Sequence, residues 1–214
     1  MRTLVLELGT LFAIINPYGL AFVFLSRTMA LSDKQRASIA RRVAIYAFFV
    51  LVVSTFAGTL ILRFFGISIP ALRIAGGLVV TAAGWALLHE TPHDGGDQPR
   101  STQSLAEIER QAFFPLTVPL TTGPGTIATA ITLAANHTAA EEGIVMQLGS
   151  VMVAAVVCLA IFHAYARVAR MARILGSEGT SVIMRLSAFL LLCVGVQIVI
   201  TGVTGVLQPL MQGR

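Results

Sequence analysis

The sequence predicts an all-α, polytopic membrane protein with about six transmembrane helices. Three observations predict this class: 12% of the 214 residues are charged, 56% are hydrophobic, and the mean hydropathy is +0.82. A soluble domain needs polar residues over its surface and usually has about 25% charged residues. A bilayer accepts the apolar surface that a soluble fold of this length cannot bury.

Six apolar stretches are each long enough to cross about 30 Å of hydrocarbon, which takes roughly 20 helical residues. They cover residues 4–25, 43–62, 69–88, 113–135, 144–163 and 182–207. We interpret the first as a retained helix rather than a signal peptide, because a Pro-Gly break interrupts it and no small-residue cleavage site follows. Segment 89–110 is rich in Pro, Gly, Asp, Gln and Ser and is predicted to be a loop. This cytoplasmic linker divides the chain into two three-helix units, 1–88 and 111–214.

The basic residues predict the orientation. Of the fifteen Lys and Arg residues, ten lie in the first, third and fifth connectors and three lie on the opposite side. Since cytoplasmic loops carry the excess of Lys and Arg, both termini are expected on the non-cytoplasmic side. Nucleic-acid binding would need these charges on one exposed face, so the distribution disfavours it.

An internal repeat relates the two halves. Pro17 breaks the first helix and Pro124 breaks the fourth, while Arg73 and Arg185 follow matching connectors at the start of the third and sixth. Arg73 lies 56 positions after Pro17, and Arg185 lies 61 after Pro124. Because three is odd, three-helix repeats enter the membrane from opposite sides. The prediction is two inverted repeats with broken first and fourth helices, an architecture common among transporters.

The two breaks form the first part of a candidate substrate site. A proline removes a backbone donor and clashes with the preceding turn, and freed polar groups at membrane depth are tolerated only inside protein or facing water. A matched pair of breaks points to a site near the midplane; two ordinary kinks are the alternative. The candidate residues are Asn16, Pro17, Gly19, Thr122, Gly123, Pro124, Gly125 and Thr126.

Threonines are dense around the second break. If a half-helix starts near Thr122, then Thr122, Thr126 and Thr129 share one face. Neutral hydroxyls and exposed backbone ends suit a small polar or zwitterionic solute. Alternatively, each hydroxyl bonds to a carbonyl of its own helix.

Arg73, Arg185 and Gln197 complete the candidate substrate-binding set. An arginine facing lipid costs at least a few kcal/mol at the membrane centre, so each either points into the bundle or snorkels to the interface. Two polar stripes accompany these residues: Arg73, Gly77, Thr81 and Gly84 on the third helix, and Gln197, Thr201, Thr204 and Gln208 on the sixth.

An enzyme is disfavoured. The membrane stretches hold no paired acids, no metal-ligand spacing of His and Cys, and no nucleophile beside a base. Cys158 and Cys193 both lie in apolar runs, which argues against a disulfide framework. We therefore expect no catalytic residue, no metal and no cofactor.

These motifs together resemble the MarC family of bacterial inner-membrane proteins, over nearly the whole chain. The matching segments are 16–19, 65–70 with 72–77, 115–119 leading to 123–127, and 185–186 followed by 194–197. The resemblance implies a six-helix inner-membrane protein of the amino-acid-exporter type, so the non-cytoplasmic side on which the basic residues predict both termini is the periplasm. Some relatives are described as transporters of small neutral amino acids. The chain departs from the family pattern at Ala21 or Phe22, at Thr121 and Thr122, and at Ala188.

The expected function is a secondary transporter or exporter of a small polar solute such as a neutral amino acid. The expected partners are that solute and the bilayer, and homo-oligomerisation is left open. Two alternatives stand: a membrane protein handling lipid-linked or amphipathic molecules, and a non-transporting helical scaffold. A polar cavity at the breaks favours the transporter, whereas a lateral apolar groove with an arginine favours the amphipathic class.

Overall fold

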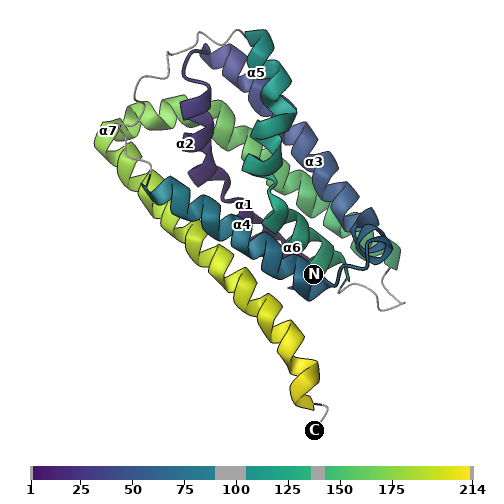
Figure 1. Cartoon of the computed structure of the whole chain (residues 1–214). Helices are drawn as coiled ribbons and strands as arrows, with labels where there is room; N and C mark the ends of the chain where they lie inside the picture. The colour runs from purple at the N-terminus through teal and green to yellow at the C-terminus, as the bar shows by residue number, and fades with distance from the viewer. Residues whose placement is uncertain (1, 90–104, 136–142, 213–214) are drawn as a thin grey trace.

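A computed structural model describes residues 2–89, 105–135 and 143–212 of the chain, and every regular element in these ranges is helical (Figure 1). The elements are α1 (Arg2–Ile15), α2 (Pro17–Arg27), α3 (Asp33–Phe64), α4 (Ile69–His89), α5 (Leu105–Gln111), the π-helix η1 (Ala112–Thr121), α6 (Pro124–Ala135) and α7 (Gly143–Gln212). Within the described ranges, five segments are long and apolar enough to cross a membrane: Thr3–Arg27, Asp33–Phe64, Ile69–His89, Met146–Gly176 and Glu178–Gln208. The predicted all-α, polytopic class is confirmed.

The predicted fourth span is divided into η1 and α6. Phe114 and Val118 have extended backbone angles (φ −128°, ψ 122° and φ −115°, ψ 123°), because each precedes a proline that excludes the helical conformation. Helix α6 then begins at Pro124 with 12 residues, about 18 Å of helix and too short to span the bilayer alone. The interruption expected at Pro124 is therefore confirmed, and it explains why only five continuous spans are found among the described residues.

The first helix is also interrupted, but more mildly. Asn16 has left-handed angles (φ 44°, ψ 60°) and separates α1 from α2, which begins at Pro17. Backbone hydrogen bonds continue across this residue, from Asn16 N to Phe12 O (2.9 Å) and from Leu20 N to Asn16 O (3.0 Å). The first break is thus a one-residue kink, not an unwound stretch.

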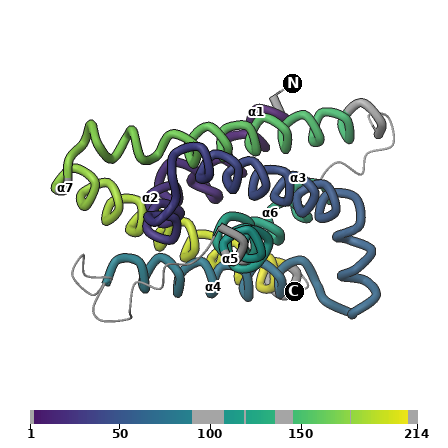
Figure 2. Tube along the Cα trace, turned by 90° about the horizontal axis from the view of Figure 1, so that it is seen from above, coloured from purple at the N-terminus to yellow at the C-terminus, as the bar shows by residue number. Residues whose placement is uncertain are grey.

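Helix α7 contains two membrane spans joined at Gly176, where φ is 69° and ψ is −178°. The chain turns back on itself there, so the two halves of α7 run in opposite directions (Figure 2). The first half continues past His163 to Gly176. The arginines that were expected in a connector, Arg167, Arg170 and Arg173, therefore lie on this helix, and all three are exposed. Their charged groups can keep this end of the helix in contact with water.

The segment predicted to be a loop, 89–110, is partly helical. Residues 90–104 lie outside the described part of the chain, and α5 occupies 105–111. Arg42 on α3 forms an ion pair with Glu109 on α5 (3.2 Å), which holds this short helix beside the start of α3. The loop prediction is therefore wrong for the last turns before η1.

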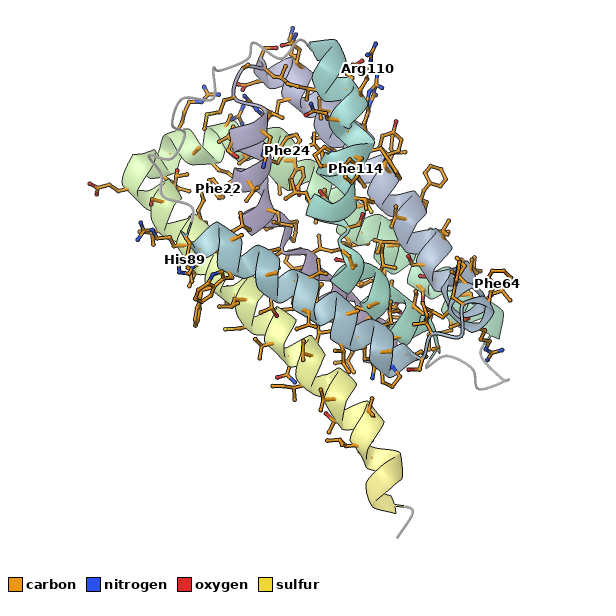
Figure 3. The ribbon with its side chains drawn as sticks, in the orientation of Figure 1. Phe22, Phe24, Phe64, His89, Arg110 and Phe114 are labelled. Carbon is orange, nitrogen blue, oxygen red and sulfur yellow. The ribbon has the colours of Figure 1, made fainter. Side chains whose placement is uncertain are left out.

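Aromatic and branched side chains from α2, α3, η1 and the first half of α7 form the core. Phe24 of α2 stacks on Tyr165 of α7, with 4.5 Å between the ring centroids, and both side chains are fully buried. Phe22 and Phe24 lie within the bundle in Figure 3, whereas Phe64 lies at the far end of α3 and is 83% exposed. Large apolar side chains cover much of the outer surface, as expected for helices that face lipid.

Candidate functional site

A cavity of about 270 Å³ lies where the two interrupted helices meet. Ile14 and Leu20 border it on either side of the first break, and Gly123 and Pro124 border it at the second. Its lining is drawn from both halves of the chain and consists of Ile14, Leu20, Val23, Arg27, Val79, Val80, Ala83, Leu87, Pro115, Leu116, Leu120, Thr121, Gly123, Pro124, Thr126 and Leu191. The expected approach of the two broken helices is therefore observed.

The cavity is mainly apolar, with polar groups at its ends. Thr121 and Thr126 lie beside the second break, while Arg27 ends α2 and is exposed. Val79 lies midway along α4 and borders the cavity although it is 45% exposed, so the cavity also has an edge at the surface of a membrane span. A solute held here would meet aliphatic side chains over most of its surface.

Three threonines in and directly after η1 donate hydrogen bonds to its backbone carbonyls. The hydroxyls of Thr117, Thr121 and Thr122 each donate to a carbonyl five residues earlier, at 2.6, 2.7 and 3.1 Å. The Thr117 carbonyl also accepts the backbone amide of Thr122 (2.7 Å), so these hydroxyls add to the hydrogen bonds of a buried, proline-containing segment. For these residues the alternative of self-bonding is the correct one, and Thr122 is a structural residue.

Tyr165 of α7 forms a hydrogen bond with Thr121, next to the second break. Its hydroxyl lies 3.0 Å from Thr121 Oγ1. Because Thr121 uses its own proton on the Leu116 carbonyl, Tyr165 donates in this pair. The stacking of Phe24 on Tyr165 therefore connects α2 and α7 to Thr121 of η1, which borders the cavity.

The candidates at the first break lie next to the cavity and not in it. Asn16 Oδ1 accepts a hydrogen bond from Gly19 N (3.2 Å) and caps α2, and Pro17 is the buried first residue of that helix. A Cβ added at Gly19 would lie 2.5 Å from Ser187 Cβ, so glycine permits α2 to approach the second half of α7. Asn16 and Gly19 border a separate hollow of about 10 Å³ and not the larger cavity.

Gly125 has a similar packing role at the second break. A Cβ there would lie 2.3 Å from Val80 Cγ2. Helix α6 therefore crosses α4 closely, and the same approach places Thr126 on the cavity wall.

Arg73 points into the bundle, as expected. It is half-buried on α4, and its Nε donates to Thr132 Oγ1 on α6 at 3.2 Å. Arg73 thus contacts the second half of the broken fourth helix, two turns beyond the residues that line the cavity.

Arg185 and Gln197 lie outside the site. Both side chains are exposed, and neither borders the cavity, so the expectation that Arg185 points into the bundle is wrong. The reason is that the second half of α7 packs against α4 through glycines on its other face. A Cβ at Gly195 would lie 2.5 Å from Thr81 N, and one at Gly77 would lie 2.7 Å from Val199 Cγ2.

The two predicted polar stripes therefore have other roles. The third-helix stripe of Gly77, Thr81 and Gly84 is a helix-packing surface, since small residues allow close backbone approach in membranes. The sixth-helix stripe is exposed; it comprises Gln197, Thr201, Thr204 and Gln208.

The cavity includes residues that the sequence reasoning did not select. Leu20, Val23 and Arg27 lie on one face of α2, and their i, i+3, i+7 spacing after the break was a usable signal. Val80 of α4 and Leu191 of α7 had no such signal, because their contact with the breaks depends on how separate helices pack. Among the described residues, no group of three or more His, Cys, Asp or Glu is placed to hold a metal ion.

Comparison with known proteins identifies the family. A family model described as "MarC family integral membrane protein" matches residues 1–207. The chain is 32% identical to the UPF0056 inner membrane protein MarC of Citrobacter koseri over 210 residues and to that of Salmonella typhimurium over 209 residues. It is 31% identical to the Escherichia coli O1:K1 protein of the same name over 210 residues, and each match covers 95% of both chains. No solved structure matches the chain. The conserved length and the apolar helices together establish that this chain is a multi-pass inner-membrane protein belonging to the MarC family.

Proposed function

We propose that the protein is a secondary transporter or exporter of a small solute that has both a polar and an apolar part, such as a neutral amino acid with an aliphatic side chain. The observation that carries the proposal is the cavity of about 270 Å³ between the two interrupted helices. Breaks in corresponding helices near the midplane are where transporters with paired repeats hold their solutes.

The volume of the cavity favours a small solute. Pockets for drug-sized ligands occupy about 300–1,000 Å³, and this cavity is slightly smaller than that range. A whole lipid would exceed it, whereas a free amino acid would fit.

The lining refines the expected solute. The sequence suggested a polar site, but aliphatic side chains such as Leu116, Leu120 and Leu191 cover most of the wall. A fully polar solute would lose hydration there without replacement hydrogen bonds. An aliphatic side chain gains from the same surface.

Transport by purified protein in liposomes tests this function. Vesicles preloaded with a mixture of neutral, acidic and basic amino acids are diluted into buffer, and the efflux of each is measured by mass spectrometry. The expected result is selective efflux of aliphatic neutral amino acids, well above that from empty vesicles. Equal efflux of every solute with and without protein would contradict the proposal.

A matched pair of variants links transport to the cavity. Ala83 and Ala82 are both exposed, and only Ala83 is among the described residues that border the cavity. Ala83→Trp should fill the cavity without displacing the core and should lower the initial rate by at least about tenfold. Ala82→Trp should leave the rate unchanged. If the two variants transport equally well, the cavity is not the pathway.

A second candidate is the handling of amphipathic or lipid-linked molecules. The mainly apolar cavity, with its exposed edge at Val79 and Arg27 at the end of α2, is the arrangement that the sequence analysis assigned to this class. An apolar chain could enter from the bilayer, and an anionic group could pair with the arginine. Native mass spectrometry of the purified protein distinguishes the candidates. A co-purified lipid that is lost in Ala83→Trp and kept in Ala82→Trp would support the second class.

A further inference from the structure

The two interrupted helices resume in the same way but are capped differently. Pro17 and Pro124 each occupy the first position of the resuming helix. At α2, the Asn16 side chain accepts from the amide of Gly19, the third residue of that helix. At α6, the residue before Pro124 is Gly123, which has no side chain to serve as a cap. Among the contacts of the described residues, the Gly125 and Thr126 amides have no hydrogen-bond partner.

Thr126 adds a third donor at the same place. Its side chain is 3% exposed and borders the cavity, and its hydroxyl makes no hydrogen bond within the described residues. Thr117, Thr121 and Thr122 nearby are equally buried, yet each donates to a carbonyl. A buried hydroxyl without a partner destabilises a fold, so the exception at Thr126 indicates a partner that comes from outside the chain.

The electrostatics at this end of α6 favour an anion. Free amides at a helix N-terminus carry partial positive charge and form an anion-binding site. Among the described residues that border the cavity, Arg27 is the one with a charged side chain, and none is acidic. Leu120, Val80 and Leu191 lie on the same wall, so the anionic group would be attached to an aliphatic part.

We infer that the N-terminus of α6 and the Thr126 hydroxyl form a carboxylate subsite, in which the solute supplies the cap that Gly123 lacks. One carboxylate has two oxygens and can accept from the two amides and the hydroxyl together. This inference rests on the proposed function, since it assigns the polar end of the transported solute to a specific set of donors.

Binding of a defined pair of probes tests the subsite without transport. Isocaproate and isocaproamide have the same aliphatic chain, and only the first has a carboxylate. Titration calorimetry on the purified protein is expected to show that isocaproate binds at least about tenfold more tightly. Equal affinity of the two probes for the wild-type protein would overturn the inference.

Substitutions at Thr126 assign the preference to its hydroxyl. Thr126→Val keeps the shape of the side chain and should remove much of the preference for isocaproate, whereas Thr126→Ser should retain it. Thr129→Val is the control, because Thr129 is on α6 but does not border the cavity. An unchanged preference in Thr126→Val, with Thr126→Ser and Thr129→Val also unchanged, would overturn the role of the hydroxyl.

A built-in cap provides an independent test. Gly123→Asp places a carboxylate at the position that Asn16 has in α2, and Asp is a favoured N-cap residue. This variant should melt at a higher temperature than the wild type and lose the preference for isocaproate; keeping the preference together with the higher melting temperature would overturn the inference. Failure of the two proposals can be told apart. If the protein transports amino acids but shows no preference for isocaproate, the carboxylate subsite is excluded and the transport function stands. If the preference depends on Thr126 but no transport is measured, the transport function is excluded and the subsite stands.

Discussion

Single residues at the basic side of the bundle do more than orient the chain in the membrane. Arg36 belongs to the connector charges that predicted the orientation, yet its side chain is buried. Its Nη2 donates to the carbonyls of Thr28 (3.0 Å) and Leu31 (2.8 Å), and its Nη1 pairs with Asp33 (2.8 Å). Asp33 also pairs with Arg173 on α7 (2.7 Å). Arg36 therefore holds together the turn between α2 and α3.

Replacement of Arg36 by lysine should destabilise this turn. A lysine cannot reproduce the planar fork that reaches two carbonyls and a carboxylate, and hydrogen bonds to a charged group contribute about 1.5–3 kcal/mol each. We expect Arg36→Lys to lower the free energy of unfolding by about 2 kcal/mol, measured by thermal unfolding in detergent. Arg41→Lys, at an exposed position, serves as the control and should be neutral; equal stability of the two variants would contradict this account.

Arg73 and Arg185 should behave differently from one another. Arg73 donates to Thr132 on α6, whereas Arg185 is exposed. We expect Arg73→Lys to lower the transport rate more than the melting temperature, because a lysine amine does not orient α6 through a fixed Nε donor. Arg185→Lys should keep both, since a snorkelling lysine is equally well solvated. Full transport by Arg73→Lys in the liposome assay would exclude this residue from the site.

At the scale of elements, the two halves share features beyond the paired prolines. Gly66 precedes α4 with φ 66°, and Gly176 precedes the last membrane span with φ 69°. The two glycines lie in the matching connectors that precede Arg73 and Arg185. Both glycines have a positive φ, which residues with a side chain rarely adopt. The correspondence supports the predicted inverted repeat, which remains a prediction.

The turn within α7 depends on Gly176. A residue with a side chain at φ 69° and ψ −178° is strained, by about 1–3 kcal/mol. Gly176→Ala should therefore lower the melting temperature although a Cβ there has open space around it. Gly9→Ala is the matched control, because Gly9 is helical and also has open space; alanine should be neutral or stabilising there. The melting temperature should fall in Gly176→Ala and should stay the same or rise in Gly9→Ala. An equal change in both variants would contradict this role of Gly176.

At the scale of the whole molecule, several basic residues gather at one end of the helix bundle. The turns after α2 and at Gly176 lie at one end of the bundle, and the start of α1 and the end of α7 lie toward the other (Figure 1). The basic residues Arg27, Lys34, Arg36 and Arg173 are near the first end. The prediction that both termini are periplasmic places this basic end in the cytoplasm; the orientation stays a prediction.

Cysteine labelling tests that orientation. Lys34→Cys and Ser68→Cys, both at exposed positions, are introduced into a Cys158→Ser, Cys193→Ser background. In whole cells with a permeable outer membrane, an impermeant maleimide should label Cys at position 68 directly and at position 34 only after the inner membrane is opened. Labelling of both positions from outside would contradict the predicted topology.

The sequence by itself determined the membrane class, the approximate spans and the positions of both breaks. These features depend on local properties: apolar length sets a span, and a proline excludes the helical conformation of the residue before it and removes a donor. The breaks at Pro17 and Pro124 could therefore be located without knowledge of any neighbouring helix.

Only the tertiary structure decided which polar residues face the cavity. Helical periodicity groups residues on one face, but lipid and the interior of a helix bundle are both apolar, so hydropathy does not say which of them a face meets. For this reason Arg185 and Gln197 were expected in the site and are exposed, while Arg27 and Leu191 border it. The difference between Thr122 and Thr126 has the same origin. The first hydroxyl donates to the backbone of the π-helical segment, and the second belongs to a residue that borders the cavity.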